Sequence, residues 1–401
     1  MTYKTLDDLS DISGKRALVR VDINVPMDGD RVTDTTRMER VKPTLLELAD
    51  KGAKVIVLAH YGRPKGKADP ALSLERLTDT FSKVLSRTVT FAPDDGSSPS
   101  VTDRVAAMQD GDILLLENSR FYPQEEANDP GFAKGLAGLG DLYVNDAFSA
   151  AHRAHATTEG IAHHLPSYAG RTLQAELEAL QRGLGAPDHP VMALVGGAKV
   201  STKLDLLGNL VTRVDHLVIG GGMANTFLAA LGHDVGASLC EHDLADTARE
   251  IMDKAEAANC EIILPSDVVV AEKFAAHAPS QVLPVGQVPS GQMILDAGPE
   301  TIELIGERIR DCRTLVWNGP LGAFELQSFD KATVLTAQEA ARATQKGGLV
   351  SIAGGGDTVA ALAHAGVVEE FTYVSTAGGA FLEWMEGKTL PGVAALEQND
   401  Q

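Results

Sequence analysis

The chain has 401 residues, of which 44% are hydrophobic and 22% are charged, and its formal net charge is −20. This length predicts two or three domains with ample material for hydrophobic cores. The acidic excess argues against nucleic acids and anionic membranes as partners, because both need a basic surface. Any cluster of arginines is therefore informative in this chain.

The cysteine content and the hydropathy of the sequence indicate the cellular compartment of the protein. Cys240, Cys260 and Cys312 are odd in number and contain no Cys-x-x-Cys pair, which predicts free thiols in a reducing environment. The N-terminus is polar and acidic and lacks the apolar core of a signal peptide. No apolar run approaches the roughly 18–20 residues of a membrane span. We expect a soluble cytoplasmic protein.

Short apolar runs alternate with amphipathic stretches along the whole chain, which predicts an α/β fold of mostly parallel sheets flanked by helices. In such sheets, ligands bind beyond the carboxyl ends of the strands. The residues that follow each predicted strand are therefore the candidates for function.

The first predicted strand carries several polar side chains. Arg20, Asp22 and Asn24 alternate within residues 16–26, so a strand would place them on one face. Burying three different polar groups requires partners, which either a polar ligand or an internal hydrogen-bond network would supply. Arg37 follows at the start of a predicted helix.

Basic residues follow three further predicted strands, at residues 54–59, 112–117 and 141–146. Their convergence at one sheet edge predicts an anion pocket, because arginine binds phosphate and carboxylate through paired N–H groups. Half of a metal site, from His152 and His155 at a spacing of three, is the alternative. The basic residues are His60, Arg63, Arg120, His152, Arg153 and His155.

A domain joint is predicted near the middle of the chain, and glycines follow the strands beyond it. Residues 172–184 place leucines at helical spacing, and the breaker-rich residues 185–190 follow. Bare glycine backbone would allow close approach of a phosphate-bearing ligand. Lys199 and Lys203 are four residues apart, so a helix that begins near Val200 would place both amines on one side.

The clearest of these glycine segments is the triplet at residues 354–356, between a strand-like run and a helix-like run that begins at Val359. Backbone N–H groups and the positive end of the helix would favour an anion there, and Asp357 would be placed to hold Mg²⁺ against a phosphate. A tight turn with glycine at positive φ would give the same sequence. The chain contains neither a Walker A loop nor a Gly-x-Gly-x-x-Gly dinucleotide motif.

Together these segments resemble the phosphoglycerate kinase family over essentially the whole chain. The resemblance implies two Rossmann-like lobes: residues 1–171 for 3-phosphoglycerate and residues 190–384 for MgADP or MgATP. It also implies an inter-lobe hinge helix and linker at residues 172–189, and a tail at residues 385–401 that returns to the first lobe. The segments that carry the resemblance are Arg20–Pro26, His60–Pro64, Ala151–His155, Gly196–Val200, Trp317–Glu325, Gly354–Thr358 and Ser375–Ala380.

The resemblance further implies individual roles. The 3-phosphoglycerate site would contain Arg20, Asp22, Ile23, Asn24, Arg37, His60, Tyr61, Gly62, Arg63, Arg120 and Arg153. The nucleotide site would contain Lys199, Lys203, Gly220, Gly221, Asn318, Glu325, Gly354, Gly355, Gly356, Asp357 and Thr358, with Glu325 on the ribose and Asp357 on Mg²⁺. The catalytic groups would be Arg37, Lys199, Gly355, Gly378 and Gly379. Thr202 and Ala377 depart from the family's usual acidic residue and glycine.

The implied activity is reversible phosphoryl transfer between 1,3-bisphosphoglycerate and MgADP, giving 3-phosphoglycerate and MgATP, by lobe closure in a monomer. It requires no general base, because a carboxyl group ordinarily ionises at about pH 4, so the acceptor carboxylate is already charged near neutral pH. A two-lobed binding protein that closes on an organic anion without catalysis is the alternative function. A dehydrogenase with two α/β lobes is disfavoured by the missing dinucleotide motif.

Overall fold

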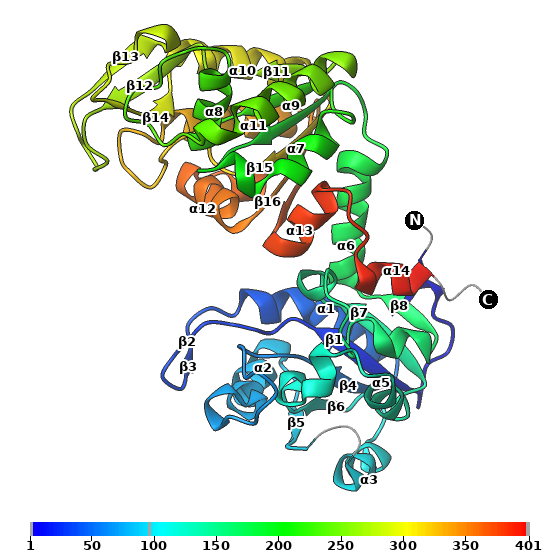
Figure 1. Cartoon of the computed structure of the whole chain (residues 1–401). Coiled ribbons are helices and arrows are strands. Elements are labelled where there is room, and N and C mark those ends of the chain that lie inside the picture. Colours follow the sequence, from blue (N-terminus) through cyan, green and yellow to red (C-terminus); the bar gives the residue numbers. More distant parts are fainter. Residues whose placement is uncertain (1–2, 95–97, 398–401) are drawn as a thin grey trace. The chain divides into compact units, whose positions relative to one another are not determined.

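The computed structural model describes residues 3–94 and 98–397 (Figure 1). It divides into two compact units. Unit 1 runs to Leu177 and includes the C-terminal residues from Thr389, and unit 2 runs from Glu178 to Lys388. Within those described ranges, each unit is built on a six-stranded parallel sheet flanked by helices. The predicted α/β fold with two mostly parallel sheets is confirmed.

The sheet of unit 1 has the strand order β5-β6-β4-β1-β7-β8. Its central strands are apolar runs buried on both faces, as expected for parallel strands covered by helices. The four central strands are neighbours, so the segments that follow them meet at one edge. The strands are β1 (Arg16–Val21), β4 (Lys54–Leu58), β5 (Val89–Ala92), β6 (Ile113–Leu116), β7 (Leu142–Asp146) and β8 (Ser167–Ala169), with the hairpin β2 (Met27–Asp28) and β3 (Arg31–Val32).

Helices of unit 1 come from both ends of the chain. The last helix packs against β8, and Gly392 fixes it there: its N–H donates to Ala151 O at 2.9 Å, and its carbonyl accepts from Asn145 Nδ2 at 3.2 Å. The helices are α1 (Thr36–Asp50), α2 (Thr78–Leu85), α3 (Pro99–Ala107), α4 (Pro123–Glu126), α5 (Pro130–Ala137) and α14 (Pro391–Glu397).

Helix α6 (Arg171–Leu180) and the π-helix Gln181–Gly185 occupy the predicted joint. The N-terminus of α6 is bonded to α1, because the Arg171 N–H donates to the Thr44 hydroxyl at 2.8 Å. The Arg171 side chain also donates to Glu47 at 2.8 Å. These contacts join α6 to the helix whose first turn carries Arg37.

The parallel sheet of unit 2 has the order β11-β10-β9-β15-β16-β17. As in unit 1, the loops that follow its central strands share one edge. The strands are β9 (Val191–Val195), β10 (His216–Ile219), β11 (Glu261–Ile263), β15 (Thr314–Asn318), β16 (Val350–Gly354) and β17 (Tyr373–Ser375).

Unit 2 also contains an antiparallel sheet that the sequence did not predict. Its order is β13-β12-β14, from β12 (Asp267–Ala271), β13 (Ser280–Pro284) and β14 (Met293–Ala297). The helices of unit 2 are α7 (Leu204–Leu210), α8 (Gly222–Ala230), α9 (Ala245–Ala257), α10 (Pro299–Asp311), α11 (Lys331–Gln345), α12 (Gly356–Ala365) and α13 (Gly378–Met385). No described helix of the chain is long and apolar enough to span a bilayer.

Candidate functional site

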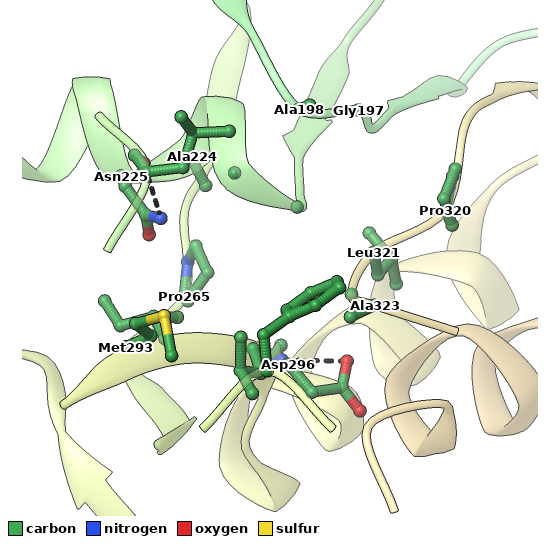
Figure 2. A pocket seen from close by; sticks show the side chains of 18 of the residues that line it. Gly197, Ala198, Ala224, Asn225, Pro265, Met293, Asp296, Pro320, Leu321 and Ala323 are labelled. Atoms are coloured by element: carbon green, nitrogen blue, oxygen red, sulfur yellow. Dashed lines mark hydrogen bonds between the residues drawn. The ribbon is translucent and has the colours of Figure 1, made fainter. Parts of the chain in front are cut away.

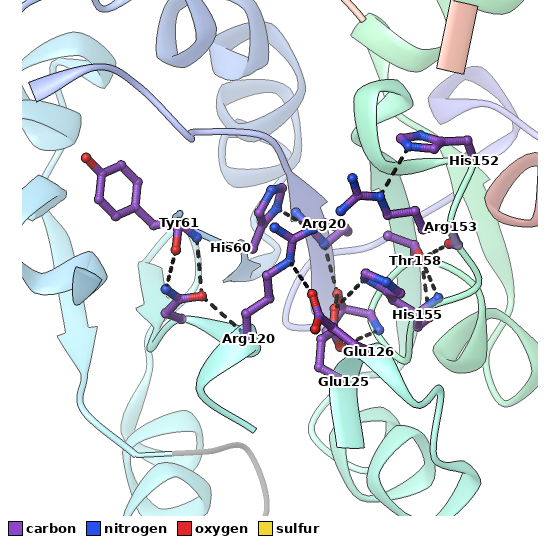
Figure 3. Close-up of polar contacts among 12 residues, drawn as sticks. Arg20, His60, Tyr61, Arg120, Glu125, Glu126, His152, Arg153, His155 and Thr158 are labelled. Carbon is purple, nitrogen blue, oxygen red and sulfur yellow. Dashed lines mark hydrogen bonds and ion pairs between the residues drawn. The ribbon is translucent and has the colours of Figure 1, made fainter. Parts of the chain in front are cut away.

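In unit 1, basic side chains gather at the carboxyl edge of the sheet, as predicted. Arg20 is the penultimate residue of β1, His60 follows β4, and Arg120 follows β6 in the 3₁₀ helix Ser119–Phe121. Arg153 and His155 follow β7. Figure 3 shows the five side chains directed toward one region.

Arg20 is the centre of this cluster and is 1% exposed. Its Nε donates to the Thr157 hydroxyl at 2.9 Å, and its Nη2 lies 2.8 Å from His60 Nδ1. A guanidinium can only donate, so His60 Nδ1 must accept and the ring proton must lie on Nε2. His60 therefore has an N–H available for an anion.

The pKa values of the buried residues His60 and His155 reflect the positive charge of the arginines around them. Burial lowers the pKa of His60 well below its usual value, and the charges of Arg20, Arg120 and Arg153 lower it further. The pKa of His155 falls to about 4 for the same reasons, with burial the largest. Both rings are neutral at pH 7, and the cations that repel their protons would attract an anion.

Arg120 is fixed by contacts on both sides. Its Nη1 donates to Gly62 O at 3.0 Å, and its Nε lies 3.4 Å from Glu126 Oε1. Tyr61 is half-buried, whereas Arg63 is exposed. Within residues 3–94 and 98–397, no group of three metal-ligating side chains is placed to bind a metal, so the two-histidine alternative gains no further ligand.

The polar residues after Arg20 lie in a loop. The prediction that Asp22 and Asn24 share a strand face with Arg20 is wrong, because β1 ends at Val21. In this loop Asp22 Oδ2 accepts from Arg37 Nη1 at 2.7 Å, and Asn24 Oδ1 accepts from the Gly62 N–H at 3.0 Å. Ile23 between them is buried.

In unit 2, the glycine triplet forms the predicted strand-to-helix turn, but α12 begins three residues earlier than expected, at Gly356. Gly355 has φ of 102°, which disfavours other residues, and a Cβ there would lie 2.8 Å from Asn318 Nδ2. That amide donates to Gly354 O at 2.9 Å. Asp357 is exposed in the first turn of α12, and Thr358 is buried.

The N-terminus of α13 lies next to that of α12. A Cβ on Gly378 would lie 3.8 Å from Gly355 Cα, so the two helix starts share one side of the sheet edge. Exposed N–H groups at two helix N-termini favour an anion. Ala377 precedes α13 with φ of −93°, which alanine adopts without strain, so its departure from glycine is tolerated. Gly379 is exposed in the first turn.

The prediction of one helix that carries both lysine amines is wrong. Lys199 is exposed and extended before the 3₁₀ helix Val200–Thr202, and α7 begins only at Leu204. Lys203 is half-buried, and its Nζ donates to Gly196 O at 2.6 Å and to Asn318 Oδ1 at 2.6 Å. Burial lowers the pKa of Lys203 to about 8, and the charge of Asp357 opposes this shift.

A pocket of about 300 Å³ opens beside the glycine loops (Figure 2). Pro320 and Leu321 form one wall, and Ala224, Pro265 and Met293 lie opposite, so a flat apolar group fits between them. Glu325 and Asp357, both exposed, lie on its rim. Gly221 lines the pocket, and Gly220 packs beneath Leu321.

Sequence reasoning missed the pocket wall formed by β14, which includes Met293, Leu295 and Asp296. The only sequence signal was a short apolar run between turn residues, which does not indicate a ligand. It also missed Thr157 and Glu125, because neither is a basic residue that follows a strand. Their hydrogen bonds beneath Arg20 depend on tertiary packing.

Comparison with known proteins shows the family of the chain. The family model "Phosphoglycerate kinase" matches residues 6–388. The chain belongs to the phosphoglycerate kinase family. It is 63% identical over 394 residues to the phosphoglycerate kinase of Agrobacterium fabrum, covering 98% of each chain. It is also 64% identical over 396 residues to that of Chelativorans sp., covering 99% of each.

Solved structures show the same fold over the whole chain. Phosphoglycerate kinase from Coxiella burnetii superposes with a TM-score of 0.94 at 40% identity and covers all of both chains. The enzyme from Pyrococcus horikoshii OT3 gives a TM-score of 0.80 at 29% identity, covering 98% of each. The chain is accordingly a kinase that transfers a phosphoryl group reversibly between 1,3-bisphosphoglycerate and ADP. The family favours this activity over non-catalytic anion binding.

Proposed function

We propose that 3-phosphoglycerate binds at the carboxyl edge of the unit 1 sheet. The observation that carries this proposal is that Arg20 and Arg120 are buried with mainly uncharged partners: a threonine hydroxyl, a neutral imidazole and backbone carbonyls. Arg120 also pairs with Glu126, but buried cations whose hydrogen-bond partners are mainly uncharged still favour an anionic ligand. The proposed binding residues are Arg20, Asp22, Ile23, Asn24, Arg37, His60, Tyr61, Gly62, Arg63, Arg120 and Arg153.

The nucleotide is proposed to bind in unit 2, with its base in the apolar pocket and its phosphates toward the two helix N-termini. Glu325 on the pocket rim would bind the ribose hydroxyls. The amine of Lys203 already donates to internal oxygens. Lys203 would therefore attract the phosphates through its positive charge. The remaining proposed contacts are Lys199, Gly220, Gly221, Asn318, Gly354, Gly355, Gly356 and Thr358.

Asp357 fits the requirements of a Mg²⁺ ligand in such a site. Mg²⁺ is commonly bound by one or two carboxylates together with substrate phosphates. The carboxylate of Asp357 is exposed, lines the pocket and lies in the first turn of the helix that would face the phosphates. Bound there, Mg²⁺ would neutralise charge on the phosphate oxygens.

Catalysis is proposed to depend on position and charge. The carboxylate of 3-phosphoglycerate needs no deprotonation, so no side chain has to act as a base. Closure of the two units would exclude water and present the transferring group to Arg37 and Lys199. The N–H groups near Gly355, Gly378 and Gly379 would stabilise charge on its oxygens.

ATP formation from ADP, Mg²⁺ and 1,3-bisphosphoglycerate tests the activity directly. We expect ATP that requires both substrates. Removal of the metal with a chelator should lower the rate by about a hundredfold or more, and excess Mg²⁺ should restore it. ATP formation that is insensitive to metal removal would contradict the role given to Asp357 and Mg²⁺.

The pKa of Lys203 predicts a pH dependence of nucleotide binding. In the free protein Lys203 loses its proton near pH 8. Bound phosphates would raise the pKa of Lys203 and so keep its amine protonated at higher pH. MgADP affinity should therefore fall by about tenfold between pH 7 and pH 9.5, with proton uptake on binding. Titration calorimetry in two buffers of different ionisation enthalpy measures both quantities.

Lys203→Met provides the control for this pH dependence. It should bind MgADP more weakly at every pH and show no proton uptake, because the titrating amine is absent. An unchanged pH dependence in Lys203→Met would assign the titration to another group.

We also propose that the protein acts as a monomer in the cytoplasm. The net charge of −20 and the glycolytic activity of the family support this assignment. Sedimentation analysis tests the oligomeric state, and cell fractionation tests the location.

A further inference from the structure

A fully buried carboxylate lies beneath the basic cluster. Glu125, in α4, is 0% exposed. Its Oε2 accepts from the Thr157 N–H at 3.0 Å, and its Oε1 accepts from the Thr157 hydroxyl at 2.5 Å. A buried carboxylate is costly unless its oxygens are bonded, and here both are. A carboxylate beside an anion site also repels the anion. The presence of Glu125 at this position therefore requires a role other than charge.

The hydroxyl of Thr157 bonds to both Glu125 and Arg20, so Glu125 determines which way the hydroxyl faces Arg20. A hydroxyl has one hydrogen, which Thr157 gives to Glu125, so its lone pairs face Arg20 Nε at 2.9 Å. The Thr157 carbonyl is held separately, because it accepts from the Tyr143 hydroxyl at 2.7 Å. Thr157 is therefore fixed in the direction that accepts the Arg20 N–H.

Arg20, held in this direction, in turn fixes the orientation of the His60 ring. Its Nη2 donates to His60 Nδ1 at 2.8 Å, which places the ring proton on Nε2. Figure 3 shows Glu125 below Arg20 and close to His155, whose Nδ1 lies 4.0 Å from Glu125 Oε1. Burial raises the pKa of Glu125, while Arg20 and the bonds from Thr157 lower it.

We propose that Glu125 and Thr157 are positioning residues for substrate, which orient the Arg20 guanidinium and the His60 ring toward the phosphoglycerate anion. This inference rests on the proposed anion site in unit 1. Neither residue would touch the substrate. Their effect would be to hold two binding groups in one orientation, which reduces the entropy lost on binding.

Two variants of Thr157 separate positioning from packing. Thr157→Val keeps the shape and removes the hydroxyl, whereas Thr157→Ser keeps the hydroxyl. We expect Thr157→Val to raise the KM for 3-phosphoglycerate about tenfold, the effect of one charge-assisted hydrogen bond, and Thr157→Ser to stay within about twofold of wild type. The KM for MgATP should not change in either variant, and thermal unfolding is measured alongside.

The Arg20 Nε–H resonance provides a direct readout. In ¹⁵N NMR spectra of the wild type it should be protected from exchange, and the protection should be lost in Thr157→Val but retained in Thr157→Ser. A lower Tm in Thr157→Val with unchanged KM for 3-phosphoglycerate would show a merely structural role and overturn the proposal.

Glu125→Gln tests the role of the carboxylate. A positioning role and a purely electrostatic role predict changes of opposite sign in the affinity for 3-phosphoglycerate. The two Thr157 donors bond to different oxygens of Glu125, and in glutamine one of these is replaced by an NH₂ group that only donates. One of the two bonds is therefore lost, Arg20 is no longer held in one orientation, and 3-phosphoglycerate binding should weaken about tenfold. If Glu125 acted only as a negative charge near the site, the neutral variant would bind the anion more tightly. Tighter binding would overturn the proposal.

Arg120→Ala distinguishes failure of this inference from failure of the site assignment. Unchanged 3-phosphoglycerate affinity in Arg120→Ala would show that the anion binds elsewhere. Lost affinity in Arg120→Ala with wild-type affinity in Thr157→Val and Glu125→Gln would leave the site in place and refute the positioning role.

Discussion

Replacing Arg37 with alanine should lower kcat by roughly a thousandfold or more, the range attributed to arginines that neutralise a transferring phosphoryl group. The affinity for MgATP should remain near wild type, because Arg37 lies in unit 1 and the proposed nucleotide residues lie in unit 2. Steady-state kinetics gives kcat, and titration calorimetry gives the nucleotide Kd.

The stability of this variant should change little. Arg37 pairs with Asp22 at 2.7 Å, but 39% of its side chain is exposed, and exposed ion pairs contribute about 1 kcal/mol or less. Arg87→Ala is a matched control, since Arg87 also pairs with an aspartate, Asp50, on the surface. A normal kcat in Arg37→Ala, or an equal loss in Arg87→Ala, would refute the catalytic role of Arg37.

Replacing Asp357 with alanine should weaken MgADP binding about a hundredfold, because the proposed carboxylate ligand of Mg²⁺ is lost. Binding of 3-phosphoglycerate should stay within about twofold of wild type, since its proposed residues belong to unit 1. Titration calorimetry with each ligand separates the two effects. In addition, wild type should bind MgADP more tightly than metal-free ADP, and Asp357→Ala should lose most of that difference.

Asp246→Ala controls for the loss of an acid near a helix N-terminus. Asp246 lies in the first turn of α9, as Asp357 does in α12, and pairs with Arg249 on the surface. It should bind both ligands as wild type does. If Asp357→Ala impaired 3-phosphoglycerate binding and spared MgADP, the assignment of ligands to the two units would be reversed.

Several features of the site were accessible to sequence reasoning because they depend on local order. In a parallel sheet the carboxyl ends of adjacent strands share an edge, so residues such as His60 and Arg120 converge wherever the strands pair in this way. The glycine triplet was recognisable as a strand-to-helix turn, and within it Gly355 has the positive φ that excludes most other residues. Both inferences used chain order and backbone chemistry alone.

Other features required the coordinates. Strand periodicity extended through Asp22 and Asn24, yet β1 ends at Val21, because alternation does not mark where pairing with neighbouring strands stops. The spacing of Lys199 and Lys203 suggested one helix face, whereas the backbone there is extended and then 3₁₀. Local spacing predicts side-chain direction only after the local conformation is known.

The amino-acid order was sufficient for the α/β architecture, for the basic edge of one sheet and for the glycine turns of the other. The burial of Glu125 against Thr157, 32 residues later, the neutral state of His60 and the apolar pocket beside β14 came only from the folded chain. These features arise from contacts between segments distant in sequence. Burial and charge act through space, so no local pattern encodes them.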